Sequence, residues 1–121
     1  MHVESTDTAP KLSRDDGLVS KLLHSERHDP ETDLTITWVT VEPGASQVQH
    51  SHDPEQVYVL VAGEGEMTVG DEQRAVTAGD CVHIPPNTTH GIENTGDEPL
   101  AYVSAATPAI PREEVEEFYD E

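Results

Sequence analysis

The stretch of sequence that decides the fold runs from residue 44 to residue 63 and reads GASQVQHSHDPEQVYVLVAG. Its second half, residues 56–62, is a nearly continuous apolar run that Gly63 interrupts, and this pattern is typical of a buried β-strand. Before that run, His50 and His52 lie two positions apart in a stretch with the character of a strand, where residues i and i+2 point to one face. Because two imidazoles on one face can bind a single metal ion, the stretch predicts both a core strand and a metal site.

Further short strands are predicted on both sides of this stretch. Residues 34–41 are β-branched and alternate in polarity, and Gly70-Asp71 is typical of a hairpin turn. The remaining strands are predicted at residues 17–23, as an edge strand, and at residues 66–69, 73–77, 81–84, 89–93 and 100–105. Many short strands separated by Gly, Pro, Asn and Asp favour an antiparallel sandwich or barrel. Residues 111–119 are predicted to be helical, because a proline in the first turn is followed by acidic residues.

Glycine, histidine and proline residues recur at a recognisable spacing through the middle of the chain. The first group begins at Gly44, and five residues separate it from the His-x-His pair, His50 and His52. Three residues then precede the polar residue Gln56, and six more precede a second glycine, Gly63. The second group begins at Gly79, and five residues separate it from Pro85. His90 follows the proline, and Asn94 follows His90 after three residues. In this order and at this spacing, the two groups resemble the two motifs of the cupin superfamily of small β-barrels, over about residues 34–106.

The resemblance implies an all-β fold, a single-domain double-stranded β-helix (an antiparallel jelly-roll barrel) of six to eight strands with a short C-terminal helix. We expect a flexible acidic N-terminal arm over residues 1–16, the barrel over residues 17–110 and an acidic helical tail over residues 111–121. The glycines of the motifs are expected in turns that need a positive φ. Asn87 stands where the second motif has a glycine, and asparagine tolerates the same left-handed conformation. The family resemblance also implies a homodimer.

The resemblance further implies that one divalent transition metal, Zn, Mn, Ni, Fe or Cu, is held in the mouth of the barrel by His50, His52, Gln56 and His90. Gln56 is a departure, because most family members have glutamate at this position. A neutral amide leaves more charge on the ion, so the site should bind metal less tightly and act as a stronger Lewis acid. Glu55 is the alternative fourth ligand. Strand alternation from His52 favours Gln56, whereas a bulge at Pro54 would favour Glu55.

The function implied is that of a metal-dependent enzyme acting on a small, oxygen-rich carbonyl or carboxylate substrate. The run His-x-His-x-x-Glu-Gln of residues 50–56 is similar to that of sugar-acid cupins, which makes isomerisation or ring opening of a sugar acid the first choice. Two alternatives stay open: a metal-dependent dioxygenase of the quercetinase or diketone-cleaving kind, and a non-catalytic cupin that binds metal or sugar. The sequence identifies no residue for proton transfer. His83 is expected to be a packed or surface histidine, Cys81 a small core or strand residue, and Tyr58 and Trp38 barrel packing.

The charge of the chain restricts its partners. There are 25 Asp and Glu residues against 6 Lys and Arg residues, a formal net charge of −19, which disfavours binding to nucleic acid and to anionic membranes. Such an acidic, lysine-poor composition is typical of proteins from halophiles, where molar salt screens the repulsion. The single cysteine excludes an internal disulfide, and no apolar run approaches the roughly 18 residues of a membrane span. Because the first residues do not have the pattern of a signal peptide, we expect a cytoplasmic protein with a small-molecule substrate.

Overall fold

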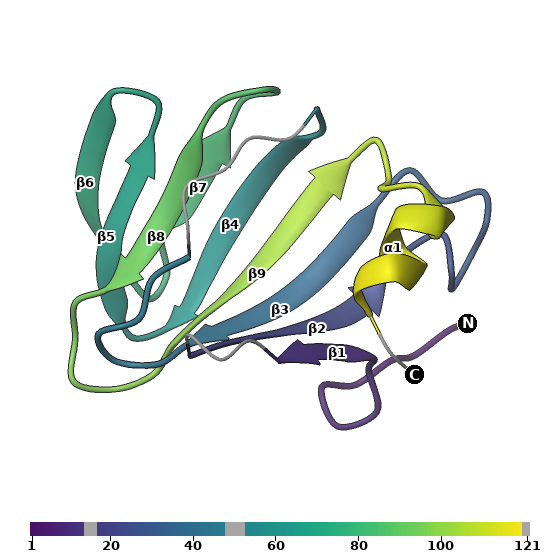
Figure 1. Cartoon of the computed structure of the whole chain (residues 1–121), viewed down its shortest axis with the longest axis horizontal. Coiled ribbons are helices and arrows are strands. Elements are labelled where there is room, and N and C mark those ends of the chain that lie inside the picture. Colours follow the sequence, from purple (N-terminus) through teal and green to yellow (C-terminus); the bar gives the residue numbers. More distant parts are fainter. Residues whose placement is uncertain (14–16, 48–52, 120–121) are drawn as a thin grey trace.

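The computed structural model of the chain describes residues 1–13, 17–47 and 53–119, and its elements are labelled in Figure 1. The described residues form nine strands and one helix: β1 (Lys11–Ser13), β2 (Leu18–His24), β3 (Thr35–Val41), β4 (Glu55–Ala62), β5 (Glu64–Val69), β6 (Glu72–Thr77), β7 (Cys81–Ile84), β8 (His90–Asn94), β9 (Leu100–Thr107) and α1 (Arg112–Phe118). A six-stranded sheet has the order β1-β2-β3-β9-β4-β7, and a three-stranded sheet has the order β6-β5-β8. All the pairings are antiparallel, which confirms the predicted antiparallel barrel with a short C-terminal helix.

The start of the chain differs from the prediction in two respects. Strand β1 lies within the segment expected to be a flexible arm, and it raises the number of strands to nine, above the expected six to eight. Because β1 pairs with β2 from Lys11↔Lys21 to Ser13↔Val19, β2 is an internal strand and the prediction that it forms the sheet edge is wrong. A three-residue strand of mixed polarity has no periodicity of its own, so its pairing depends on β2 rather than on a local signal.

Turns with a positive φ occur where the spacing of the motifs places them. Gly44, Gly63 and Gly79 have φ values of 81°, 82° and 99°, and Asn87 has a φ of 58°, which confirms the expectations for all four residues. At Gly63 the space is also restricted, since a Cβ atom would lie 2.8 Å from the carbonyl oxygen of Pro99. The asparagine of the second motif is structural: buried Asn94 donates two hydrogen bonds of 2.8 Å to the carbonyl oxygens of Val41 and Glu98.

The register of the large sheet arranges its inward-facing side chains in rows that become more polar from one end of the barrel to the other. The end that is closed by apolar side chains has the row Leu18, Val41 and Leu100. The next rows are Ser20, Val39, Tyr102 and Leu60, and then Leu22, Thr37, Ser104 and Tyr58. The row at the opposite, open end is Thr35, Ala106, Gln56 and Ile84.

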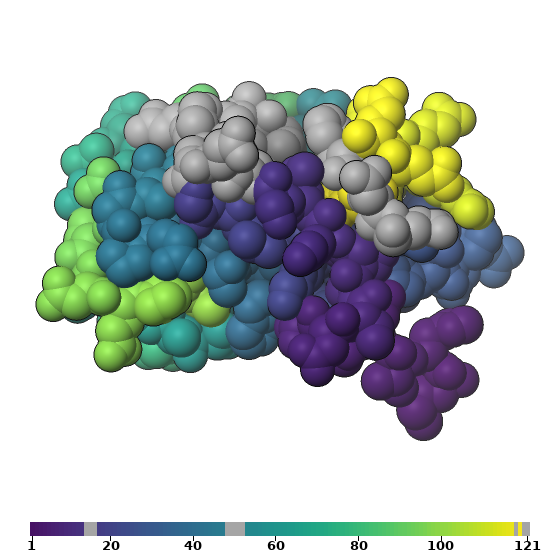
Figure 2. Space-filling model, turned by 60° about the horizontal axis from the view of Figure 1, so that its bottom comes forward, coloured from purple at the N-terminus to yellow at the C-terminus, as the bar shows by residue number. Residues whose placement is uncertain are grey.

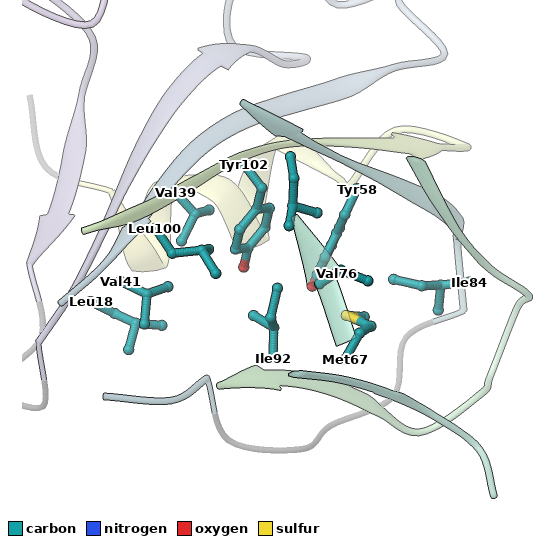
Figure 3. Close-up of a cluster of buried hydrophobic side chains, with 11 residues drawn as sticks. Leu18, Val39, Val41, Tyr58, Met67, Val76, Ile84, Ile92, Leu100 and Tyr102 are labelled. Atoms are coloured by element: carbon teal, nitrogen blue, oxygen red, sulfur yellow. The ribbon is translucent and has the colours of Figure 1, made fainter. Parts of the chain in front are cut away.

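The apolar rows supply the hydrophobic core between the two sheets. Figure 3 shows these side chains filling the space between the sheets, with the hydroxyl groups of Tyr58 and Tyr102 pointing into it. From the three-stranded sheet, the buried side chains of Met67, Val76 and Ile92 face them. The core therefore fills the closed end of the barrel, and some of its side chains, such as Leu18 and Val39, also line the cavity together with the more polar rows of the open end.

Helix α1 packs beside the open end. Val115 is its buried anchor, at 3% exposure, and two backbone N–H groups tie the segment to the sheet side: Ile110 donates to Thr35 Oγ1 at 2.9 Å, and Arg112 donates to Glu26 Oε1 at 2.8 Å. Figure 2 shows the helix at one end of the molecule, near the N-terminal residues. None of the helices within the described residues has the length and apolar character that crossing a membrane requires.

Candidate metal centre and its cavity

A cavity of about 910 Å³ opens between the polar rows of the large sheet and helix α1. Its volume lies in the range of roughly 300–1,000 Å³ that is typical of small-molecule sites. Strand β4 contributes Gln56 and Tyr58 to the lining, and strand β9 contributes Tyr102 and Ser104. The cavity therefore contains one of the predicted metal ligands together with several neutral polar side chains.

Gln56 faces into this cavity from β4 and is only 7% exposed. Its amide oxygen Oε1 is buried and accepts no hydrogen bond within the described part of the chain. Because a buried polar atom normally has a partner, this oxygen is suited to a ligand that the described part of the chain does not supply. An amide oxygen directed into a cavity fits the ligand role predicted for Gln56, since carbonyl oxygens coordinate divalent cations.

Glu55, the alternative ligand, faces away from the cavity. Its carboxylate Oε2 lies 2.6 Å from His83 Nε2, and the side chains of Glu55 and His83 are 50% and 57% exposed. The register of β4 runs without a bulge through Glu55↔Thr107 and Gln56↔Ala106, so the two side chains point to opposite faces of the sheet. Gln56 is therefore the member of this pair on the cavity side, and His83 is a surface histidine as expected.

His90 is buried on β8, at 1% exposure. Its Nδ1 atom lies 2.8 Å from the carbonyl oxygen of Thr88, and since a carbonyl can only accept, Nδ1 carries the hydrogen. The lone pair of the neutral ring is then on Nε2, which is the arrangement found in metal-binding histidines whose other nitrogen is held by a carbonyl. The chemistry of His90 therefore fits the ligand role predicted for it.

His50 and His52 lie outside the described residues, so two of the four predicted ligands are placed here. The two ligands that can be placed, Gln56 and His90, are both neighbours of Tyr58. Gln56 precedes Tyr58 by two positions on the same face of β4, and the ring of His90 meets the ring of Tyr58 edge-on, with the ring centres 5.9 Å apart. Within residues 1–13, 17–47 and 53–119, no three His, Cys, Asp or Glu side chains form a group that could hold a metal ion. The predicted site consequently depends on histidines 50 and 52 joining Gln56 and His90.

The sequence did not single out Gln47, which organises the polar interior. Its Oε1 atom accepts hydrogen bonds from Tyr58 Oη at 3.0 Å and from Tyr102 Oη at 3.1 Å, and the two phenol rings stack at 4.2 Å. Gln47 is a glutamine in a loop before His50 and has no motif role, so no sequence signal distinguishes it. Tyr58 does pack in the barrel as expected, and it also lines the cavity. Cys81 is an exposed strand residue outside the core.

Burial keeps both phenols protonated. It raises the pKa of Tyr58 to about 12, and it also raises the pKa of Tyr102 well above its usual value, where the nearby Tyr58 adds to the effect. At neutral pH each hydroxyl therefore keeps its hydrogen, which is donated to Gln47. The phenol oxygens can accept hydrogen bonds from hydroxyl groups of a ligand, but at this pH neither phenol is ionised.

Comparison with known proteins identifies relatives of this architecture. The profile of the family described as "Cupin domain" matches residues 37–106. An uncharacterized protein of Methanocaldococcus jannaschii is 31% identical over 108 residues, which cover 88% of this chain and 86% of that protein. The H2HPP isomerase of Bacillus subtilis is 38% identical over 69 residues, which cover 56% of this chain and 28% of the isomerase.

Solved structures share the fold over most of the chain. An RmlC-like cupin from Shewanella frigidimarina superposes with a TM-score of 0.79 at 23% identity, covering 95% of this chain and 96% of that chain. Oxalate decarboxylase of Bacillus subtilis, an enzyme with Mn(II) centres, superposes with a TM-score of 0.74 at 26% identity. That match covers 84% of this chain but only 28% of the decarboxylase, so the chain corresponds to a part of that enzyme.

Proposed function

The chain belongs to the cupin family, and from this premise we propose that it is a metal-dependent enzyme acting on a small, oxygen-rich carbonyl or carboxylate substrate. A sugar acid is the first choice, converted by isomerisation or ring opening. The observation that carries the proposal is the buried Oε1 atom of Gln56, which faces a ligand-sized cavity without a hydrogen-bond partner in the described chain. The likeness to an isomerase and to a Mn(II)-containing decarboxylase supports the same class of chemistry.

Gln56 and His90 would hold the metal together with histidines 50 and 52. A divalent ion bound there would act as a Lewis acid that polarises a carbonyl or carboxylate oxygen of the substrate. Since these ligands are three neutral imidazoles and a neutral amide, none of them offsets the charge of the ion. Apart from the carboxylate of Asp53, which lines the cavity near Gln56, the negative charge at this end would therefore come from the substrate, which favours a substrate with a carboxylate or an acidic hydroxyl.

The chain's own residues would bind and orient the substrate. Tyr58 and Tyr102 keep their protons at neutral pH, and Gln47 holds both phenol hydrogens, so their oxygens accept from substrate hydroxyls. The side chains of Thr37 and Ser104 line the same cavity with hydroxyl groups. These hydroxyl groups lie among apolar side chains such as Leu22 and Val39, so the lining suits a substrate with both hydroxyl and C–H surface, such as a sugar acid.

Elemental analysis and turnover test this proposal together. We expect protein purified without a chelator to contain Zn, Mn or Ni and to convert an unsaturated uronate, with activity lost in EDTA and restored by the metal. Gln56→Ala should lower both the metal content and the activity, whereas the neighbouring surface substitution Glu55→Gln should leave both unchanged. Bound Fe or Cu, with oxygen consumption on a diketone or flavonol, would replace the proposal by the dioxygenase alternative. Metal binding without turnover of any of these substrates would favour the non-catalytic alternative.

We also propose that the protein is a homodimer, as the family resemblance implies. The outer side of β4 supports this, because Val59 and Val61 are 38% and 41% exposed there. Adjacent exposed apolar side chains commonly mark a contact surface. Sedimentation in molar salt, where repulsion between chains of this charge is screened, should give a dimer mass, and Val59→Glu should shift it to the monomer. A wild-type monomer at all concentrations would contradict the proposal.

A further inference from the structure

The cavity extends well beyond Gln56, toward helix α1. Gln56 lies on β4, and the inner face of the sheet continues through β9 and β3 to β2, where Tyr119 Oη meets Ser20 Oγ at 2.6 Å. Neighbouring strands are about 4.8 Å apart, so the far side of the cavity lies roughly 10–15 Å from the strand that carries Gln56. We call the part of the cavity toward α1 the helix-side subsite and define it by six lining residues, of which Ser104 on β9 is the nearest to β4: Ser20, Thr37, Ser104, Glu114, Glu117 and Tyr119.

Two neutral hydroxyl groups of the large sheet line the helix-side subsite, beside apolar side chains such as Leu22. Thr37 and Ser104 are directly opposite on β3 and β9, and Ser104 is only 7% exposed. Neither side chain makes a hydrogen bond to another of the described residues, in contrast to Ser20, which is paired with Tyr119. Each hydroxyl can donate one hydrogen bond and accept others. A pair of adjacent, mostly buried hydroxyls with this capacity is suited to the hydroxyl groups of a ligand.

No cation balances the acidic groups of the helix-side subsite. Among the described lining residues of the whole cavity there is no Lys, Arg or His; Asp53 lines the end beside Gln56, and the exposed Glu114 and Glu117 are contributed by α1. Arg112, the basic residue of the helix, is engaged by Glu116 at 2.7 Å and does not line the cavity. A carboxylate or phosphate placed here would meet two carboxylates at the exposed rim, with only hydroxyl and apolar groups below them, so this part of the cavity disfavours anions.

Combining these observations with the proposed function, on which this inference rests, we propose that the helix-side subsite binds the uncharged, hydroxyl-bearing end of the substrate. The single acidic group of the substrate then lies at the Gln56 end, where a divalent cation held by the Oε1 atom of Gln56 would attract it and outweigh the nearby carboxylate of Asp53. The enzyme should consequently accept sugar mono-acids and discriminate against sugar diacids and phosphorylated sugar acids of the same length.

Three probes with one carbon skeleton test this selectivity. Gluconate, glucarate and 6-phosphogluconate share a carboxylate at carbon 1 and carry at carbon 6 a hydroxyl, a carboxylate or a phosphate. Calorimetric titration into the Zn-loaded full chain should show gluconate binding at least tenfold more tightly than the other two. Equal or tighter binding of glucarate or 6-phosphogluconate would overturn the inference, and so would the failure of all three to bind.

A charge reversal on the helix locates the discrimination. Glu114→Lys should raise the affinity for glucarate and 6-phosphogluconate at least tenfold and leave that for gluconate nearly unchanged. Glu113→Lys is the matched control, since it makes the same charge change in the same turn at a residue that does not line the cavity. An equal gain in both variants would overturn the placement of the subsite. Thermal unfolding of both variants establishes that they are folded.

These measurements separate the subsite from the reaction. If gluconate is preferred and Glu114→Lys removes the preference, the subsite is supported even when no sugar acid is turned over, and only the proposed function fails. If a sugar acid is turned over but glucarate binds as tightly as gluconate, the proposed function stands and the subsite is wrong.

Discussion

Replacing Gln56 by glutamate tests the metal centre with opposite effects in the metal-free and metal-loaded protein. Gln56 is 7% exposed, and its Oε1 atom has no hydrogen-bond partner in the described chain. A carboxylate at this position would be buried, and when the metal is absent none of the described residues that line the cavity carries a positive charge to offset it. When the metal is present, the same carboxylate would be paired with the ion and would offset part of its charge. Gln56→Glu should therefore destabilise the metal-free protein and strengthen metal binding.

The size of the destabilisation follows from the cost of burying a charge. An unpaired ionised carboxylate costs several kcal/mol in a protein interior, and a shift of one pKa unit corresponds to about 1.4 kcal/mol, so a loss of about 3 kcal/mol at pH 7 is expected. The pKa of the new carboxyl would be raised above that of the unfolded chain, so the loss is absent near pH 4 and grows as the pH rises. For a domain of this size, about 3 kcal/mol lowers the Tm by roughly 12 °C.

The assay is thermal unfolding with EDTA and with excess Zn²⁺, combined with titration of Zn²⁺ into the metal-free protein. In Gln56→Glu we expect the Tm to fall in EDTA, to recover with Zn²⁺, and the Zn²⁺ affinity to rise by at least about tenfold. Glu55→Gln makes the reverse change at the adjacent residue. Because Glu55 is half exposed and its carboxylate is paired with the surface residue His83, that variant should alter stability by less than about 1 kcal/mol and leave Zn²⁺ affinity unchanged. An unchanged or weaker Zn²⁺ affinity in Gln56→Glu would refute the assignment of Gln56 as a ligand.

Three further outcomes are expected. Raising NaCl from 0.1 M to 2 M should increase the Tm, because salt screens repulsion within a chain of net charge −19; a constant or falling Tm would exclude the halophilic interpretation. Asn94→Ala should lower the free energy of unfolding, measured by urea denaturation, by about 2–4 kcal/mol, because the carbonyl oxygen of Val41 loses the hydrogen bond donated by the Asn94 side chain. A loss below about 1 kcal/mol would contradict the structural role of Asn94. Because the pKa of Tyr58 is raised in the folded protein, the free energy of unfolding should be unaffected by this group below pH 10 and should decline from about pH 10 to 12. An equally steep decline in the Tyr58→Phe variant would assign the pH dependence to other groups.

Alternation of polarity was sufficient to predict most of the strands. Residues 81–84 form β7 as predicted, and the strand predicted over residues 34–41 differs from β3 by one residue at its start. Positive φ values at Gly63 and Asn87 were predictable because few residues adopt that conformation without strain. These features depend on neighbours in the sequence or on one residue's own stereochemistry.

Features made by distant residues could not be predicted in this way. Strand β1 exists through its pairing with β2, and the contact between Tyr119 and Ser20 joins residues 99 positions apart. The tail was predicted to be helical, yet nothing in its sequence indicated that Glu114 and Glu117 would line the cavity. Gln47 likewise acquires its role only when β4 and β9 bring two phenols to its amide oxygen. Such roles follow from the register and topology of the sheet.

The orientation of Gln56 shows how the core determines the site. Glutamate is the usual ligand, and Glu55 is adjacent, but turning Glu55 inward would shift β4 by one residue and carry Tyr58 and Leu60 to the outer face. Both side chains are at most 2% exposed, and moving two large apolar groups into water would cost about 3–6 kcal/mol. The free energy gained by replacing an amide ligand with a carboxylate would have to exceed that cost. A carboxylate ligand on this strand is consequently attainable by substitution at position 56 and not by reorientation of Glu55.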